Sequence, residues 1–166
     1  WVDPRQIHFV AQANVSDSRS QVFGSVEAAV SLTDMFNTQG KLQLSTAKID
    51  STMRLTDIPI DAISHATVGS SSLTALIGPV LNCQLLAKGN LAKFDATLRL
   101  QSDCLNSTTT LAVRDGQFSL LDKPHVQLTI DRSAWTALTS QGGRSPVTQL
   151  LKPFTIELVP TQLSGP

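Results

Sequence analysis

The chain of 166 residues has no tyrosine, and aromatic residues make up only 5% of it. Trp1 and Trp135 stand far apart in the sequence, so there is no aromatic platform for sugar rings or single-stranded bases. Charged residues are also scarce, at 16%, and the formal net charge is zero. A neutral chain lacks the electrostatic footprint of a nucleic-acid-binding protein and the polybasic patch that attracts anionic lipid headgroups.

Cysteine is scarce as well, since Cys83 and Cys104 are the only two. Neither has another cysteine or a histidine at metal-ligand spacing, so no metal site is predicted. We interpret them as half-buried apolar thiols, with a disulfide as the alternative in an oxidising compartment. If residues 81–87 and 94–101 pair, Cys83 lies opposite a residue near Leu100 and away from Cys104.

Long apolar runs are absent, and none approaches the roughly 18 residues needed to span a bilayer. No membrane span is therefore expected within these residues, and no signal-peptide pattern is present. The sequence begins at Trp1 without a methionine and ends in mid-pattern at Pro166. We interpret the chain as one section of a larger, repetitive β-rich protein.

No arrangement of polar side chains indicates catalysis. His8, His65 and His125 are far apart, and none has a nucleophile at a diagnostic spacing. The loop at 142–145 looks like a phosphate loop but lacks the lysine and the long helix that follows it. No catalytic residue and no cofactor are predicted, and a hydrolase or carbohydrate-active domain is the least favoured reading.

What the sequence does contain is a regular alternation of apolar and polar residues. Between about 81 and 130, apolar residues recur with period two, and turn residues interrupt them at 88–90, 115–116 and 122–124. This pattern predicts an antiparallel meander with one dry face and one wet face. The candidates for the dry face, which would contact lipid or a protein core, are Phe94, Leu98, Leu100, Leu111, Val113, Phe118, Leu120, Leu128 and Ile130.

The same alternation predicts strands on both sides of the meander. Residues 7–15 and 22–32 form two of them, and 42–55 form one or two more. Gly24 marks an expected bulge or bend in the second strand. A final strand runs over 154–158.

Two breaks in the alternation predict short helices. Pro59, with Asp57 or Ile58 near the cap, starts the first helix, which ends at Gly69. A second helical turn follows a serine cap at 70–72, places Leu73, Leu76 and Ile77 inward and stops at Gly78. Beyond the meander, Asp131 or Ser133 caps a helix that carries Trp135 and Leu138, and a third helix with Val147, Leu150 and Leu151 follows Pro146.

The predicted fold class is mainly β (α+β): a long twisted antiparallel sheet or half-pipe, with short amphipathic helices inserted between strand groups. A closed barrel whose mouths are capped by the helices is the rival architecture. The expected sub-regions of 1–166 are N-terminal strands at 1–56, short helices at 57–78, the meander at 79–130, and short helices with a final strand at 131–166.

The order of these segments resembles the AsmA-like family, which includes TamB-type proteins. Leu-Thr-Asp-Ile-Pro at 55–59 leads into a short helix, and the chain leaves this helix at Leu-Ile-Gly, residues 76–78. The next strands are supplied by 83–91, 98–102, 111–118 and 126–130. The resemblance covers about 55–158. The short helices are a departure from the plain groove of that family.

The resemblance implies a section of a cell-envelope protein that is periplasmic and whose parent chain is anchored in the inner membrane of a diderm bacterium. Members are similar to bridge-like lipid-transfer proteins, so the implied role is phospholipid transport or outer-membrane biogenesis. Phospholipid acyl chains and adjacent repeats of the same chain are the implied partners.

Two functions therefore stand side by side. The dry face is either left open as a groove for acyl chains or covered, which would make the chain a structural or interaction module. The deciding observation is where Ile60, Ile63, Leu73, Leu76, Trp135 and Leu138 pack.

Overall fold

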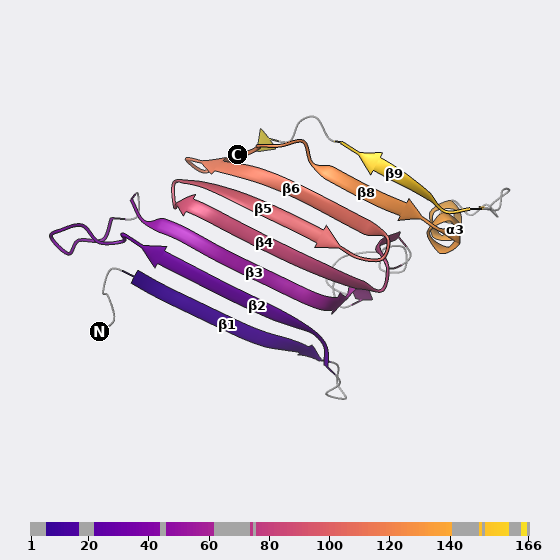
Figure 1. The fold of residues 1–166 in the computed structure, drawn as a ribbon, viewed down its shortest axis with the longest axis horizontal. Coiled ribbons are helices and arrows are strands. Elements are labelled where there is room, and N and C mark those ends of the chain that lie inside the picture. The colour runs from indigo at the N-terminus through magenta and orange to yellow at the C-terminus, as the bar shows by residue number, and fades with distance from the viewer. Residues whose placement is uncertain are drawn as a thin grey trace.

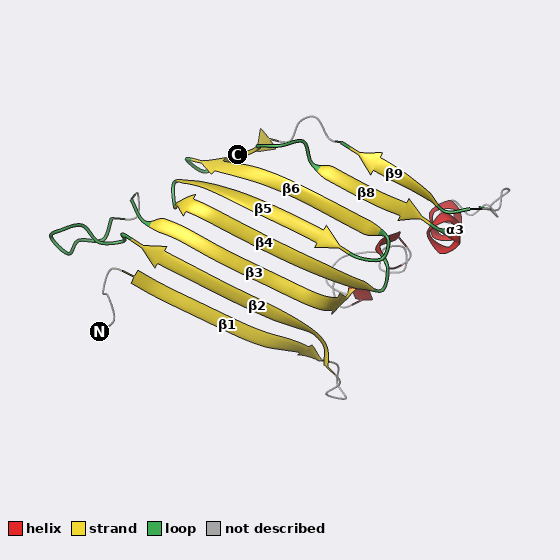
Figure 2. Cartoon of the chain, viewed as in Figure 1, coloured by secondary structure: helices red, strands yellow, loops and turns green. Residues whose placement is uncertain are grey.

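The computed structural model describes residues 6–16, 22–43, 46–61, 74, 76–140, 150, 152–159 and 164–165. Most of these residues belong to one antiparallel sheet, which spreads as a single layer (Figure 1). In this part of the chain, helix occurs only at one end of the sheet (Figure 2). The mainly β class with short helices between strand groups is confirmed. The sheet is open, so it is not the closed barrel considered as the rival.

The described part of the sheet contains ten strands. From β1 to β7 each strand pairs with the next one along the chain, and β10 pairs with β7. The strands are β1 (Gln6–Ser16), β2 (Val22–Thr33), β3 (Lys48–Pro59), β4 (Val80–Asn90), β5 (Lys93–Gln101), β6 (Leu105–Arg114), β7 (Gln117–Leu120), β8 (His125–Ile130), β9 (Phe154–Leu158) and β10 (Ser164–Gly165).

The meander prediction needs one correction, because β8 does not pair with β7. It pairs with residues 105–108 of β6, while β7 pairs with residues 111–114. Strand β7 has only four residues and therefore satisfies only half of β6. The chain then passes Pro124 and continues in the same direction as β8, along the half of β6 that β7 left unpaired.

The hairpin turns follow the sequence in one case and depart from it in another. Asp115 and Gly116 have φ values of 53° and 82°, as a two-residue type I′ turn requires. Between β4 and β5 the turn lies at 91–92, so its predicted position at 88–90 is wrong. Asn90 explains the shift, because its Oδ1 accepts the N–H of Lys93 at 2.6 Å and closes the turn two residues later.

The predicted helix start at Pro59 is also wrong. Strand β3 continues through a bulge at Asp57, whose φ is 52° and whose N–H donates to Asn82 Oδ1 at 2.9 Å. Beyond the bulge, Ile58 and Pro59 pair with β4, and helical geometry begins only at Ile60. Asp57 is therefore a bulge residue rather than a cap. The expected helix residues Ile63, Val68 and Gly69, Leu73 and the serine cap at 70–72 lie outside the described residues.

The crossover from β3 to β4 is held to the end of the sheet by hydrogen bonds. Ile60 donates its N–H to the carbonyl of Pro79 at 2.9 Å, and the Ser102 hydroxyl donates to the carbonyl of Ile77. Gly78 ends the helical turn, as predicted, with φ at 103°. Ile60 is only 2% exposed, and its hydrogen bond to Pro79 places its backbone beside the start of β4.

Helix α3 (Arg132–Ser140) stands at the same end (Figure 1). Of the two predicted caps, Asp131 is the one used: its Oδ1 accepts the N–H of Ala134 at 2.8 Å. The Trp135 ring meets the ring of Phe154 edge-on, with centroids 6.3 Å apart. Residues 141–149 and 151, where a loop and a third helix were predicted, lie outside the described residues, and β9 follows as expected.

The structure also tests three smaller predictions for the N-terminal side of the sheet. Leu42 forms an isolated bridge with Phe36 instead of a strand, and Leu44 lies outside the described residues. Gly24 sits at a close backbone approach, since a Cβ there would be 2.6 Å from the carbonyl oxygens of Thr56 and Asp57. Strands β1 and β2 otherwise match the predicted ranges.

The chain buries little of itself. Its accessible surface is 11524 Å², whereas a compact monomer of 17.8 kDa exposes about 8,000 Å². Over the described residues the strands form a single layer, which contributes to this excess. The buried apolar residues of this part of the chain are mostly small: Ala47, Ile58, Ile60, Ala87, Ala96, Ala112, Ile130 and Ala134.

Two glycines provide a matched test of the hairpins. At Gly116 a Cβ would meet nothing within 4 Å, whereas at Gly89 it would lie 2.5 Å from the carbonyl oxygen of Lys93; both have positive φ. We expect Gly116→Ala to lower the free energy of unfolding by about 1–2 kcal/mol through backbone strain alone. Gly89→Ala should cost clearly more, because strain and overlap add. Urea denaturation of the two variants measures this, and equal losses would contradict the strand position of Gly89.

Asp131 provides a pH-dependent test of α3. The N–H of Ala134 holds the pKa of the Asp131 carboxyl below its usual value. The stabilisation is therefore present above the pKa of the unfolded state and lost as the pH falls through the lower pKa of the folded state. Asp131→Ala should cost about 1 kcal/mol at neutral pH, and the difference from wild type should shrink in acid. Asp131→Ser, a cap without a titrating group, is the control: it should be close to wild type at neutral pH and become the more stable of the two in acid, because only wild type loses its cap contribution there.

Candidate functional site

The strand register sorts the side chains onto two faces. Residues that stand directly opposite each other on neighbouring antiparallel strands project from the same side of the sheet. Following these partners from strand to strand therefore traces rows across one face. One row runs through Phe9, Val30, Ser51, Ala87, Ala96, Leu111 and Leu120, from β1 to β7.

The face that contains this row is here called the apolar face. It comprises the odd-numbered residues of β1, β4 and β6, the even-numbered residues of β2 from Gly24 onward and of β5, β7, β8 and β9, and, in β3, the odd-numbered residues up to Leu55 followed by Ile58. None of these strand residues is charged, and apart from Cys83 the polar ones are Ser51, Ser107 and Thr109. A charge-free and mainly apolar surface thus runs from β1 to β9.

The opposite face, here called the polar face, carries every charged residue of β1 to β9 except Asp57 in the bulge. Its polar contacts are exposed: Arg114 Nη2 forms an ion pair with Asp95 Oδ1 at 2.6 Å, and His125 Nδ1 lies 3.1 Å from Glu157 Oε1. Such pairs contribute about 0–1 kcal/mol each, since water screens them. The polar face is therefore the solvated one.

All nine residues predicted for the dry face lie on the apolar face. Strands β5, β6 and β7 bring Phe94, Val113 and Phe118 into one row, and Leu111 stands opposite Leu120. Ile130 lies opposite Phe154 and is only 1% exposed. The others, Leu98, Leu100 and Leu128, are half-buried.

The sequence prediction missed the extent of this face. Strands β1 to β3 and β9 continue it with large side chains such as Ile7, Val26, Met53 and Ile156. Their alternation was visible in the sequence, but only the pairing of β3 with β4 across residues 60–79 shows that they share a face with the meander.

Among the described residues, the apolar face has almost no cover. Trp135 of α3 meets Phe154 at one corner of the sheet, and the described strands all belong to a single sheet. Phe9 is 56% and Leu158 50% exposed at the two sides of the sheet. Towards the middle, residues are half-buried because their neighbours on the same face pack against them. The side chain of Leu138 lies outside the described residues.

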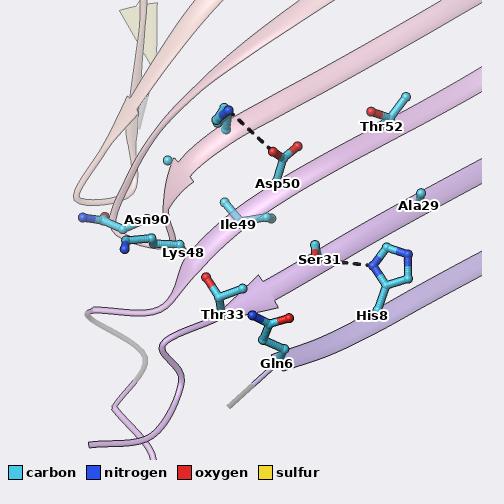
Figure 3. A pocket seen from close by; sticks show the side chains of 12 residues that line it. Gln6, His8, Ala29, Ser31, Thr33, Lys48, Ile49, Asp50, Thr52 and Asn90 are labelled. Carbon is cyan, nitrogen blue, oxygen red and sulfur yellow. Dashed lines mark hydrogen bonds and ion pairs between the residues drawn. The ribbon is translucent and has the colours of Figure 1, made fainter. Parts of the chain in front are cut away.

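Two neighbouring hollows lie on the polar face. A depression of about 730 Å³ on the polar face is lined by His8, Lys48, Asp50 and Lys88 (Figure 3). It continues past Ala29 into a second one of about 350 Å³. These hollows form because small side chains of β2 lie between longer ones of β1, β3 and β4.

The charged groups around the large hollow already have partners. Lys88 Nζ lies 3.7 Å from Asp50 Oδ2, and Lys48 Nζ lies 2.7 Å from the exposed Asp34. The Nδ1 of His8 is 3.4 Å from the hydroxyl of Ser31 (Figure 3). No charge is left over to select a polar ligand, so the hollow is solvated surface rather than a built site.

Metal and membrane-spanning features can be examined over the described residues. There, no group of three or more His, Cys, Asp or Glu side chains gathers where a metal could bind. His65 lies outside these residues. No described helix has both the length and the apolar character to cross a membrane.

Both cysteines are free, half-buried thiols. Cys83 lies on the apolar face, opposite Leu55 on one side and Leu100 on the other, as the pairing prediction required. Burial raises the pKa of its thiol. Cys104 lies between β5 and β6, where burial, and then the carboxylates of Asp131 and Asp103, raise the pKa of its thiol.

Comparison of the chain with protein-family models, with curated proteins and with solved structures finds no match. The candidate site therefore rests on the geometry of the sheet.

The two thiols test the surroundings assigned to them. In the single-cysteine variants Cys104→Ser and Cys83→Ser, alkylation should follow a pH–rate profile displaced upward from that of the same thiol in urea, because burial disfavours the thiolate. At neutral pH, both should react more slowly in the folded chain. Stopped-flow alkylation over a pH series measures this. Identical profiles with and without urea would show that the thiols are not desolvated.

Proposed function

We propose that this chain is a non-enzymatic section of an AsmA-like envelope protein and that its apolar face binds phospholipid acyl chains during transport between membranes. The observation that carries the proposal is the charge-free face that runs from β1 to β9 and has almost no cover among the described residues. A sheet with water on both sides does not need such strict separation of charged and apolar side chains. Exposed apolar patches of this extent mark binding surfaces.

The dimensions of the sheet suit an acyl chain. Strand β4 has 11 residues, which at about 3.4 Å per residue gives a length of about 37 Å. The hydrocarbon core of a bilayer is about 30 Å thick and holds two leaflets, so one extended acyl chain is shorter than the strand. A chain lying along the strands would remain on apolar side chains over its whole length.

The energetics require no specific polar contact. Each methylene removed from water contributes about 0.8 kcal/mol when fully buried. On an open face roughly half of that applies, which corresponds to about a twofold gain in affinity per methylene. A site of this kind discriminates by chain length rather than by headgroup, which agrees with the absence of charged residues on the apolar face.

The resemblance gives the proposal its cellular setting. It supports a periplasmic location, a parent protein anchored in the inner membrane, and a role in phospholipid transport or outer-membrane biogenesis.

The competing function is a structural or interaction module whose apolar face is covered by other parts of the protein. The burial of Ala87 and Ala96 in the middle of the face favours it, since small buried residues are what a packed layer requires. The two functions differ in whether a polar side chain on this face is tolerated.

A matched pair on β5 separates them. Leu98 lies on the apolar face between Leu85 and Thr109, whereas its neighbour Thr97 lies on the polar face between Leu86 and Thr110. On an open face, Leu98→Asp should keep the chain folded and weaken binding of a fluorescent acyl probe by about tenfold or more, whereas Thr97→Asp should bind as wild type does. Circular dichroism and probe titration measure the two outcomes. Unfolding of Leu98→Asp alone would favour the structural module.

Cys83 gives a readout that does not disturb the face. In the Cys104→Ser chain, saturation with a single-chain phospholipid should slow maleimide labelling of Cys83 several-fold. In the Cys83→Ser chain, labelling of Cys104 at the strand turn should change little. Equal rates with and without lipid at Cys83, in a folded chain, would contradict acyl-chain binding on this face.

A further inference from the structure

Strand β1 forms one edge of the sheet over 11 residues. It contains no charged residue, no proline and no glycine, and Phe9 and Val10 are 56% and 66% exposed. An edge strand directs alternate N–H and C=O groups outward, where they can pair with another strand. Edges that are long, uncharged and apolar are the ones most prone to do so.

The opposite side of the sheet is built differently. Strand β9 has five residues, includes Glu157 and follows Pro153. The described strand that pairs with the outer edge of β7 is β10, which has two residues. Short strands, an edge charge and proline are the usual devices against edge-to-edge pairing. Strand β1 carries none of them, which identifies its edge as the one open to a partner.

The hydrogen-bonding pattern of β1 restricts how a second β1 can pair with it. The outward-directed groups belong to residues of one parity, because the residues between them bond to β2. Two β1 strands in antiparallel pairing can therefore bond only when the numbers of opposite residues share a parity. That condition also sets apolar residues opposite apolar ones, so the two apolar faces join on the same side.

The sequence of β1 fits such a pairing about its centre, Ala11. In this register Phe9 stands opposite Ala13 of the second copy, so a large side chain meets a small one, and Ile7 stands opposite Val15. On the polar face, His8 stands opposite Asn14. No like charges oppose each other anywhere along the strand, and the register uses the whole length of β1.

We propose that the partner of this edge is a second copy of the chain and that two β1 strands pair antiparallel about Ala11. The two sheets then form one continuous sheet, with a twofold axis perpendicular to it and a single apolar face on one side. The contact is isologous and uses each edge once, so it closes as a dimer.

Cysteine cross-linking tests the register. In a chain with Cys83→Ser and Cys104→Ser, Ala11→Cys places two cysteines directly opposite each other, within reach of a disulfide. Ala13→Cys, on the same face of the same strand, places them about four residues apart. We expect a covalent dimer from Ala11→Cys only. Equal cross-linking of both variants would overturn the proposal.

A charge pair tests the contact without cysteines. His8 and Asn14 both stand opposite serines of β2, so charge at either position meets no charge directly opposite within its own sheet. In the dimer, His8→Lys with Asn14→Lys sets two like-charged pairs opposite each other, and the dissociation constant should rise about tenfold or more. His8→Lys with Asn14→Glu sets opposite charges there and should dimerise at least as well as wild type. Light scattering over a dilution series measures both, and a wild-type chain that stays monomeric throughout would overturn the proposal.

Discussion

The whole structure depends on the phase of its strand register. Side chains alternate with period two, so a slip of one residue would move every charged side chain of a strand onto the apolar face. The bulge in β3 shows how this phase is kept. Asp57 is the next odd-numbered residue after Leu55 and would continue the apolar face. The extra residue of the bulge removes it from the row and puts Ile58 there instead, opposite Leu81 and only 6% exposed.

A sheet that keeps its phase but has no second layer is stabilised differently from a two-layered domain. Its free energy of folding comes from the backbone ladders and from contacts between neighbouring side chains on one face, each worth about 0.2–1 kcal/mol. Such contacts bury only the sides of the apolar residues and leave their tips exposed. The same arrangement that limits the stability of the chain therefore leaves a surface on which further burial is favourable.

The sequence predicted the alternation of apolar and polar side chains well. It predicted poorly the positions at which local hydrogen bonds or backbone geometry override that alternation. The alternation placed all nine candidate residues, from Phe94 to Ile130, on one face, and Asp115-Gly116 specified its own turn. Asn90 closed a turn that the preceding glycine was expected to form, because a side-chain oxygen satisfied the amide of Lys93. Pro59 predicts a helix start by its type alone, although proline is equally compatible with the end of a strand, which is where it lies.

The pairing across long connections was less accessible still. Strand β3 pairs with β4, and β8 pairs with β6 rather than with β7. Both pairings depend on which backbone groups remain unpaired after the local hairpins form, and the periodicity of a single sequence does not contain this information. The full width of the apolar face follows from those two pairings. A prediction confined to the meander therefore recognised the character of the face and underestimated its size.

The face and the edge of β1 rely on different physical terms, which makes the two proposals independent of each other. Binding on the apolar face removes apolar surface from water and needs no hydrogen bond, whereas pairing at β1 satisfies backbone N–H and C=O groups and buries little of the face. A lysine pair at His8 and Asn14 lies on the polar face at the edge and leaves every apolar-face residue in place. An aspartate at Leu98 lies in the middle of the sheet, on β5, which β2, β3 and β4 separate from β1, and leaves the edge intact. Loss of one property with retention of the other would thus assign each to its own part of the molecule.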